Sequence, residues 1–406
     1  MFLNTVNQKI FGANNIKYLF ITCTARGGGN LVARMISSHD QVNIAVDPFL
    51  EIFKLARNKL LNTEKPSNLR KSIPDYFYNK SFLNYYKKLT RKSLDIDTDK
   101  DNYRAFFGRH KLRLDLQCNE LIKFIPKKPI LNIKHLLEIS LHSIQKSRFP
   151  KNGNIIGIKD SWIIELFPAL AKTFKNAKFI LVVRDPRACI SSNYSLKSEN
   201  IKANSCSFVR SWRKNIAFLS ELESNPKIKE RIHLIKYEDL ITRPKITAKK
   251  IFKFLELPFR QKVLDPKNYF DYSKNIPWTS NSSFSVKKQK IYKSSLDRWK
   301  KVLPFNLLCL VEIISYPELR MLGYRPTTNV HKKETINAAI RYIMNEKNKG
   351  TGWSSNNNLA DEIKKIKLDY NKNFYEPGDN LQKFLFLSHY NKIFPFLKNP
   401  TGRANE

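Results

Sequence analysis

Arg26 and the three glycines after it, Gly27 to Gly29, have the composition of a turn that binds phosphate or a similar anion. They lie between an apolar, β-prone run, Tyr18 to Ile21, and a segment with helical spacing of apolar residues, Leu31 to Ile36. Glycines let backbone N–H groups approach an anion, and a helix N-terminus adds partial positive charge. A plain strand-to-helix turn is the alternative interpretation, and partners elsewhere in the chain must decide between the two.

A second candidate anion site starts at Arg184, directly after a short apolar run. A helix is predicted there within residues 184–195, and Ser192 lies on it. An arginine at a strand end and a serine in the first turns of the next helix can face one phosphate, the arginine as a bidentate donor and the serine as a hydroxyl donor. We expect Arg187 to pair with Asp185 or a nearby glutamate and so to shape the turn.

The elements that must position these residues alternate between strands and helices. Apolar runs predict buried strands at 154–159, 178–183 and 232–236, and helical spacing predicts helices at 162–174, 210–222 and 248–255. Near-continuous apolar strands separated by helices are typical of a parallel sheet that is covered on both faces. The predicted fold class is therefore α/β, with three layers, α/β/α, around a central parallel sheet.

Two long segments carry few strand signals. Residues 58–150 are rich in Lys, Asn and Tyr, have helical spacing at 131–144, and predict a helical insertion. Residues 326–406 are rich in Asn and Lys, with weak helical spacing and an aromatic patch, and we treat them as a C-terminal extension. Between them, residues 259–292 are polar and loop-like, and a helix is predicted from Leu307 to Ile314.

The charge of the chain is strongly positive. Its 406 residues include 73 Lys and Arg against 35 Asp and Glu, a net charge of +38. Such a balance favours anionic partners, such as nucleotides, sulfated or phosphorylated substrates, nucleic acid or an acidic membrane face. A compositional bias toward Lys, Asn and Ile is the alternative cause.

The five cysteines are scattered and show no CxxC spacing, which argues against a disulfide framework or a zinc site and fits a reducing compartment. No stretch approaches the 18 or more apolar residues of a membrane span. The sequence thus predicts a soluble, cytoplasmic protein without a membrane span.

Four segments together resemble the sulfotransferase family, whose members move a sulfuryl group from 3′-phosphoadenosine 5′-phosphosulfate (PAPS) to a hydroxyl or amine. They are ARGGGNLVARMISSH (25–39), VVRDPRACISSNYS (182–195), IKYEDLITRPKITAKKIFKFLELP (235–258), and SSLDRWKKVL with LRMLGY (within 294–324). The resemblance covers about residues 15–325, matches 58–150 poorly, and has the motif spacing of the carbohydrate and tyrosylprotein branch. It implies a P-loop-like sulfotransferase fold, with PAPS as co-substrate and no metal.

The glycine turn departs from the family pattern. Members usually have Arg or Lys followed by Ser-Gly-Ser/Thr-Thr, whereas here the run is Arg26, Gly27, Gly28, Gly29, Asn30. The backbone cradle is kept and the Asn30 amide can donate one hydrogen bond, but the usual hydroxyl donors are replaced. The departure lowers the expected donor affinity.

The resemblance implies three catalytic residues. Negative charge spreads over the oxygens of a sulfuryl group in transfer, so cations must lie beside it, and Arg26 and Lys159 match the family's positions for them. The acceptor hydroxyl needs a general base, and the family spacing leads to Asp47, with Glu51 as the fallback. Lys159 can instead be a solvated strand-end lysine, and Asp47 can be the N-cap of a helix that starts at Pro48.

The same resemblance implies a set of nucleotide-binding residues. They are Arg26, Gly27, Gly28, Gly29, Asn30, Leu31, Arg184, Ser192, Tyr237, Ser295, Arg298 and Trp299. Tyr237 can instead be a core aromatic residue, and Trp299 can instead pack against the last helix of the domain. We interpret His39 as structural.

The leading prediction is a PAPS-dependent sulfotransferase that acts on an acceptor hydroxyl, with carbohydrate favoured over protein tyrosine. A P-loop kinase is disfavoured because GGGN lacks the Gly-Lys-Ser/Thr that holds phosphates and magnesium. A non-catalytic, basic polyanion-binding protein that keeps the fold is the other alternative. No reader motif for a specific nucleic acid is visible.

Overall fold

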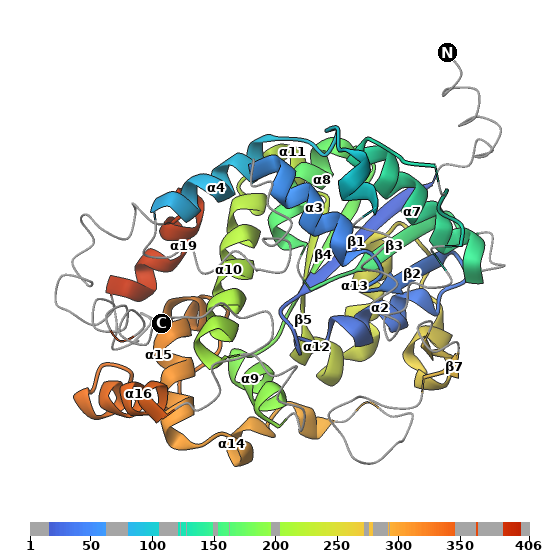
Figure 1. Cartoon of the computed structure of the whole chain (residues 1–406). Helices are drawn as coiled ribbons and strands as arrows, with labels where there is room; N and C mark the ends of the chain where they lie inside the picture. Colours follow the sequence, from blue (N-terminus) through green and yellow to red (C-terminus); the bar gives the residue numbers. More distant parts are fainter. Residues whose placement is uncertain are drawn as a thin grey trace.

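The computed structural model has a central sheet with helices on both faces (Figure 1). It describes residues 16–61, 80–104, 121, 123–126, 128–148, 153–161, 163–195, 204–271, 276–278, 291, 293–345, 363 and 385–398.

The sheet has five parallel strands in the order β2-β3-β1-β4-β5. The strands are β1 (Lys17–Cys23), β2 (Val42–Val46), β3 (Ile155–Lys159), β4 (Lys178–Val183) and β5 (Ile232–Lys236). The parallel sheet and four of its strands are as predicted. The edge strand β2 was not predicted.

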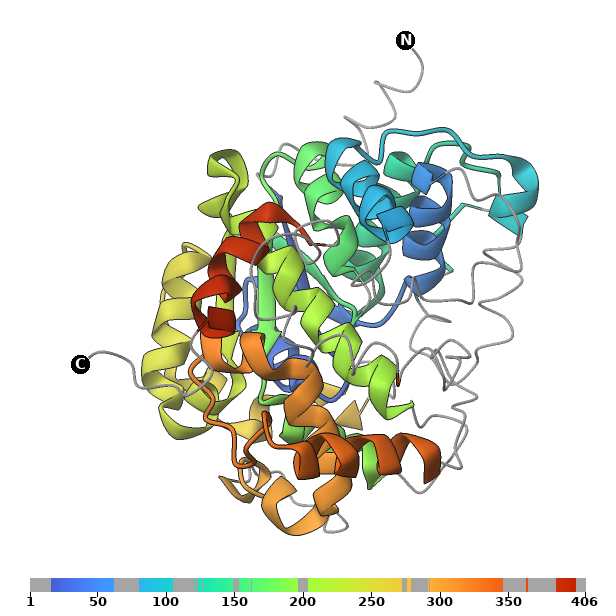
Figure 2. The same cartoon turned by 90° about the vertical axis from the view of Figure 1, so that its left-hand side faces the viewer.

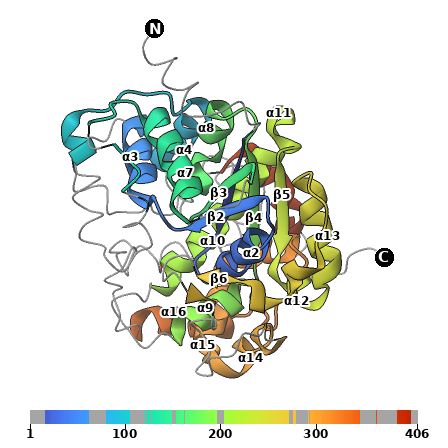
Figure 3. The same cartoon turned by 90° about the vertical axis from the view of Figure 1, so that its right-hand side faces the viewer.

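Side chains alternate between the two faces of each strand, so β1 contributes to two separate cores. Leu19 and Ile21 pack with α2 (Gly29–Ser37), α12 (Tyr237–Thr242) and α13 (Pro244–Phe254). These three helices cover one face of the sheet (Figure 3).

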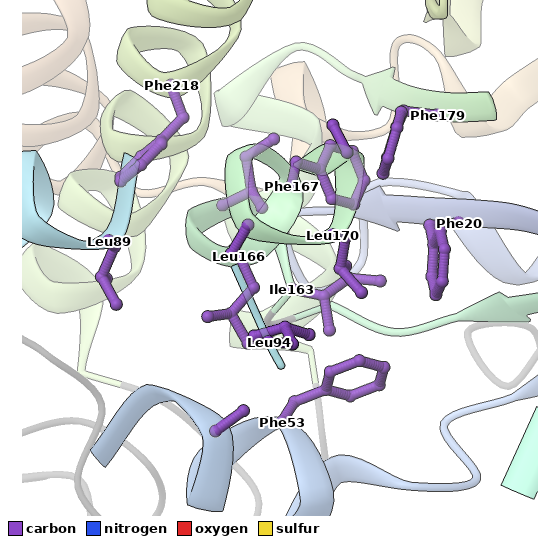
Figure 4. Packing of buried hydrophobic residues seen from close by; sticks show 14 of the residues in the cluster. Phe20, Phe53, Leu89, Leu94, Ile163, Leu166, Phe167, Leu170, Phe179 and Phe218 are labelled. Atoms are coloured by element: carbon purple, nitrogen blue, oxygen red, sulfur yellow. The ribbon is translucent and has the colours of Figure 1, made fainter. Parts of the chain in front are cut away.

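Phe20 points to the opposite face. There it lies in the larger core with Phe53, Phe167, Phe179 and Phe218 (Figure 4). This core is closed by α3 (Leu50–Leu61), α4 (Lys80–Arg91), α7 (Ile133–Arg148), α8 (Phe167–Thr173) and α10 (Ser205–Glu223). The predicted three-layer α/β/α arrangement is therefore confirmed.

The described part of 58–150 contains the end of α3, then α4 and α7, with an isolated bridge between Asp97 and Asn132, and the predicted helix at 131–144 is confirmed as α7. The helical insertion stays a prediction. In the described part of 326–406, α16 (Lys333–Asn345) packs against α15 (Phe305–Met321), and α19 (Leu387–Lys398) packs against α10 and α15. Both helices lie beside α15 in the view of Figure 2. The domain boundary at 325 stays a prediction.

Several predicted helices have different bounds. The helix expected at 162–174 is a 3₁₀ turn, η2 (Ile164–Leu166), followed by α8, while Trp162 lies outside the described residues. The helix expected at 248–255 is α13, which starts four residues earlier, at Pro244, and ends at Phe254. The short helix α12 was not predicted.

The remaining elements are short, apart from α9. They are α9 (Pro186–Tyr194), α11 (Pro226–Lys229), η4 (Gln261–Leu264), η5 (Pro266–Asn268), β6 (Phe270–Asp271), β7 (Ile276–Pro277), η6 (Lys293–Ser295) and α14 (Trp299–Val302). Within the described residues, no helix is long and apolar enough to cross a membrane.

Candidate active site

Each of the five parallel strands places one predicted site residue at the carboxyl edge of the sheet. Arg26 follows β1, Asp47 follows β2, Lys159 ends β3, Arg184 follows β4 and Tyr237 follows β5. The carboxyl ends of parallel strands share one edge, where open α/β sheets bind ligands. Residues that are far apart in the sequence thus meet there.

The glycine turn lies directly against two of these residues. A Cβ added to Gly28 would lie 2.2 Å from Cδ2 of Tyr237, and Gly28 has the left-handed φ of 90°. A Cβ on Gly29 would lie 2.5 Å from Sγ of Cys23 and 3.1 Å from Cε of Lys159. Close packing therefore requires both glycines, and it places the turn between Tyr237 and Lys159.

Lys159 and Asp47 are joined by two contacts. The Lys159 ammonium donates to Oδ1 and Oδ2 of Asp47 at 3.1 and 3.3 Å, and the Asp47 backbone N–H donates to the Lys159 carbonyl at 2.6 Å. Ser161 Oγ also accepts from Nζ, at 3.0 Å. Asp47 has a φ of 50°, a conformation that non-glycine residues adopt mainly where surrounding contacts impose it.

The structure excludes the alternative interpretations of both residues, and their catalytic roles stay predictions. Lys159 is 3% exposed, so it is not a solvated lysine. Burial opposes its charge, but the Asp47 carboxylate outweighs it with help from Asp160 and raises the pKa of Lys159, so the ammonium stays charged. The helix α3 starts at Leu50, so Pro48 is not its first residue, and the Asp47 side chain bonds Lys159 instead of acting as the expected cap.

Arg184 is the centre of a second group. Its Nη1 donates to the Arg26 carbonyl at 3.1 Å, its Nη2 donates to the Ser295 carbonyl at 2.6 Å, and its guanidinium lies 4.4 Å from the ring centroid of Tyr237. The Tyr237 hydroxyl and Ser295 Oγ are 3.2 Å apart. The Nε of Arg184 is buried without a hydrogen-bond partner. A buried donor of this kind is where an anionic ligand fits.

Ser192 belongs to the same group. Its Oγ accepts from Nε of Arg26 at 2.9 Å. Burial lowers the pKa of Arg26, and the nearby positive charges of Arg184 and Arg298 lower it further. Two further positive charges near the Arg26 guanidinium favour a bound anion beside it. The residues present therefore fit a phosphate-bearing ligand.

Arg187 forms a buried network behind this group. It pairs with Asp185 at 2.7 Å, as expected, and donates to Glu312 at 2.7 Å and to the Arg325 carbonyl at 2.8 Å. Trp299 lies over its guanidinium, 4.1 Å from the ring centroid. Trp299 thus packs on Arg187 of α9, whereas the packing alternative expected it against the last helix, and its role in nucleotide binding stays a prediction.

The other predicted residues lie around the turn. Asn30 is exposed on the first turn of α2, and Leu31 is buried in the core beside it. Glu51 is buried on the first turn of α3. The ring of His39 bonds the backbone through both nitrogens, as a structural histidine does: Nδ1 accepts from Gln41 N–H, and Nε2 lies 3.1 Å from the Pro258 carbonyl oxygen.

Two residues near Lys159 were not predicted from the sequence. Ser161 bonds its ammonium, and buried Cys23 lies beneath Gly29. Ser161 follows Lys159 by two positions, which is a usable signal, whereas nothing in the sequence marks Cys23. Among the residues that the structure describes, no group of His, Cys, Asp and Glu could hold a metal ion.

This geometry defines an α/β protein with a group of basic residues that suits an anion at the carboxyl edge of a parallel sheet. A family model described as "Sulfotransferase family" matches residues 19–261, more than half of the chain. The chain belongs to the sulfotransferase family, and thus to a family of transferases.

Relatives of known function come from two branches of that family. A protein-tyrosine sulfotransferase of Drosophila melanogaster is 29% identical over 174 residues, 42% of this chain and 33% of that protein. Carbohydrate sulfotransferase 3 of Tetronarce californica is 24% identical over 178 residues, 40% of this chain and 39% of that protein. The chain therefore spans only a third to two fifths of the length of these relatives.

Among solved structures, the sulfotransferase domain from the curacin biosynthetic pathway aligns with a TM-score of 0.43 and 20% identity. That alignment covers 76% of this chain and 98% of the domain.

Proposed function

We propose that the protein transfers a sulfuryl group from PAPS to an acceptor hydroxyl. The observation that carries this proposal is the pairing of two groups beside one glycine turn. Arg184 and Ser192 lie with Tyr237 on one side, and the ion pair of Lys159 and Asp47 lies on the other. The first group suits phosphate, and the second suits charge stabilisation and proton transfer.

The residues on the nucleotide side of the site bind and orient the donor. Arg184 offers its buried, unpartnered Nε, and Ser192 offers a hydroxyl whose oxygen already accepts from Arg26. The turn provides backbone N–H groups at the N-terminus of α2. PAPS, when bound, supplies an activated sulfuryl group.

The Lys159–Asp47 pair acts at the acceptor. Lys159 keeps its positive charge in a buried position, where it stabilises negative charge that develops during transfer. The Asp47 side chain is 34% exposed, so an acceptor can reach it. The oxygen of the acceptor hydroxyl is the nucleophile, and as it attacks, a carboxylate oxygen of Asp47 takes its proton.

We propose a carbohydrate hydroxyl as the acceptor. A relative named carbohydrate sulfotransferase 3 and the net charge of +38, which suits an anionic glycan, support this choice. Protein tyrosine is the alternative, supported by the relatives named protein-tyrosine sulfotransferase. A labelled-sulfate transfer screen against glycans, tyrosine peptides and small phenols distinguishes the two.

Thermal unfolding with different ligands tests the donor. A ligand at 100 times its Kd stabilises the folded state by about 2.7 kcal/mol. We expect 3′,5′-adenosine bisphosphate to raise the Tm, and ATP with magnesium and duplex DNA to leave it nearly unchanged. No shift with the bisphosphate at millimolar concentration refutes the proposal, a shift with ATP and magnesium alone supports a kinase, and a shift with DNA alone supports a polyanion-binding protein.

We also propose a cytoplasmic location. The described cysteines Cys23, Cys189 and Cys309 are free and buried, which suits a reducing compartment. Fluorescence microscopy of a tagged full-length chain in its native cell tests this.

A further inference from the structure

One turn of the helix α10, residues 212–215 (WRKN), bonds four different segments of the chain. All four side chains are at most 3% exposed. Arg213 pairs with Glu318 of α15 at 2.9 Å, and Lys214 pairs with Glu165 of η2 at 3.2 Å. Removing one partner of a buried ion pair is strongly destabilising, so these two pairs fix both the position and the rotation of α10 at this turn.

The first and last side chains of the turn bond the backbone near the site. Trp212 Nε1 donates to the Arg184 carbonyl at 2.9 Å. The Asn215 amide faces Thr24, and its oxygen accepts from the Thr24 hydroxyl at 3.0 Å and from the Thr24 N–H at 3.1 Å. In that orientation the amide NH₂ donates to the Ser211 carbonyl at 3.3 Å, so every polar group of the side chain has a partner.

The two bonded residues occupy equivalent places in the sheet. Thr24 is the first residue after β1, and Arg184 is the first residue after β4, the strand beside it. The Thr24 carbonyl also accepts from the Gly27 N–H at 2.8 Å, so Thr24 fixes the start of the glycine turn. Arg184 starts the segment that leads to Ser192. One helix therefore holds the first residue of both loops.

These bonds from α10 use groups that an anion does not need. The two loops also contact each other directly, where Arg26 donates to Ser192 and Arg184 donates to the Arg26 carbonyl. A bound phosphate competes for those side-chain donors. The Arg184 carbonyl, in contrast, is an acceptor that cannot bind an anion, and Thr24 is only 5% exposed. The bonds from Trp212 and Asn215 therefore persist when a ligand is present.

We propose that Trp212 and Asn215 are positioning residues that set the distance between the glycine turn and the segment from Arg184 to Ser192. This rests on the proposed function, in which a nucleotide with two phosphate groups contacts both loops. A ligand with two binding groups gains affinity from the second only where the geometry lets both groups bind together. The two residues contact no ligand, and through the loops they determine the preference for a bisphosphate over a monophosphate.

Three nucleotides measure this preference. Calorimetric titration of the full chain with 3′,5′-adenosine bisphosphate, adenosine 3′-phosphate and adenosine 5′-phosphate gives a Kd for each. Trp212→Phe removes the indole N–H and keeps an aromatic ring, and Asn215→Leu removes the amide at similar size. We expect each variant to raise the Kd of the bisphosphate about 10-fold or more. Each monophosphate uses one loop, so its Kd should rise less than about 2-fold.

Two variants control for loss of stability alone. Trp278 is 1% exposed, and its indole N–H has no hydrogen-bond partner in the described part of the chain, so Trp278→Phe is the matched control for Trp212→Phe. Ser220→Ala removes a hydroxyl of α10 that lies 3.1 Å from Nδ1 of His389. We expect neither control to change the ratio of bisphosphate to monophosphate Kd values, even where the Tm falls.

Asn215→Asp is the conservative variant. Its carboxylate keeps an oxygen that accepts from Thr24, so it should retain the preference for the bisphosphate that Asn215→Leu loses. Thermal unfolding shows which variants fold, and Trp212→Phe, the milder change, decides the test where Asn215→Leu does not fold.

Equal weakening of all three nucleotides by Trp212→Phe and Asn215→Leu overturns the proposal, because α10 then supports each loop separately. Unchanged Kd values in both variants overturn it as well. If the parent protein binds none of the three nucleotides, the proposed function itself fails, and this result is distinct from the other two.

Discussion

Replacing Glu312 tests how much one buried carboxylate contributes to the stability of the structure behind the site. It is fully buried in α15, and its two oxygens accept five hydrogen bonds. Arg187 donates one at 2.7 Å, and the backbone N–H and hydroxyl groups of Thr327 and Thr328 donate four at 2.6–2.9 Å. This carboxylate joins α9, which carries Ser192, to the chain after α15.

The isosteric change Glu312→Gln replaces one carboxylate oxygen with an amide NH₂, for example Oε2, which in the parent accepts from two donors of Thr328. At least one backbone N–H then loses its acceptor, and Arg187 loses one of its two carboxylate partners. Hydrogen bonds to charged groups contribute about 1.5–3 kcal/mol each, and breaking a buried ion pair costs about 3–5 kcal/mol. Because Asp185 still pairs with Arg187, we expect the lower end, about 3 kcal/mol.

Urea unfolding followed by tryptophan fluorescence measures this loss. Glu312→Gln should lower the midpoint with little change in the m-value, which would indicate a change in stability rather than in the denatured state. The same substitution at exposed Glu334, in the first turn of α16, is the control, and we expect a loss of at most about 1 kcal/mol there. A Glu312→Gln loss within about 1 kcal/mol of zero refutes the reasoning.

Three further predictions concern the glycine turn, the candidate general base Asp47 and the pH dependence of stability. Gly28→Ala should lower both Tm and nucleotide affinity, because the new Cβ meets the Tyr237 ring at 2.2 Å and the φ of 90° is strained; an unchanged Kd contradicts this. Asp47→Asn should keep the Kd for 3′,5′-adenosine bisphosphate and lower kcat by about 10²–10⁴-fold. If the variant turned over at the parent rate, Asp47 would not be the general base, and Glu51 would be the next candidate.

The third concerns His389, where burial lowers the pKa against the effect of Glu318. The unfolded chain takes up this proton near pH 6.5 and the folded chain only at lower pH, so the free energy of unfolding should fall below pH 6.5 by up to about 1.4 kcal/mol per unit. Urea midpoints at pH 7.5 and 5.5 should show a smaller drop in His389→Gln than in the parent; equal drops contradict this.

The fold was largely predictable because its signal is local. Strands that are buried on both faces are nearly continuous apolar runs, and helices repeat their apolar residues at another period, so both can be identified within a dozen residues. The strand β2 was not predicted because Asn43 interrupts its apolar run and because its partner β3 lies more than a hundred residues later in the chain. Which strand β2 pairs with depends on the tertiary structure.

The site was predictable in composition but not in pairing. Its residues follow strand ends, and the parallel sheet alone brings those ends to one edge. Whether Lys159 was solvated, whether Asp47 capped a helix and where Trp299 packed depended on contacts with distant segments. The structure pairs the first two residues with each other and places Trp299 on Arg187.

The sequence by itself determined that Arg26 and a glycine turn stand between a strand and a helix, with a second arginine and serine at another strand end. Only the tertiary structure decided that Arg26 bonds Ser192, 166 positions away, and that Lys159 bonds Asp47, 112 positions away. The physical reason is the strand order, which makes neighbours of segments that are distant in the chain. Local propensity carries no information about which side chains meet across that edge.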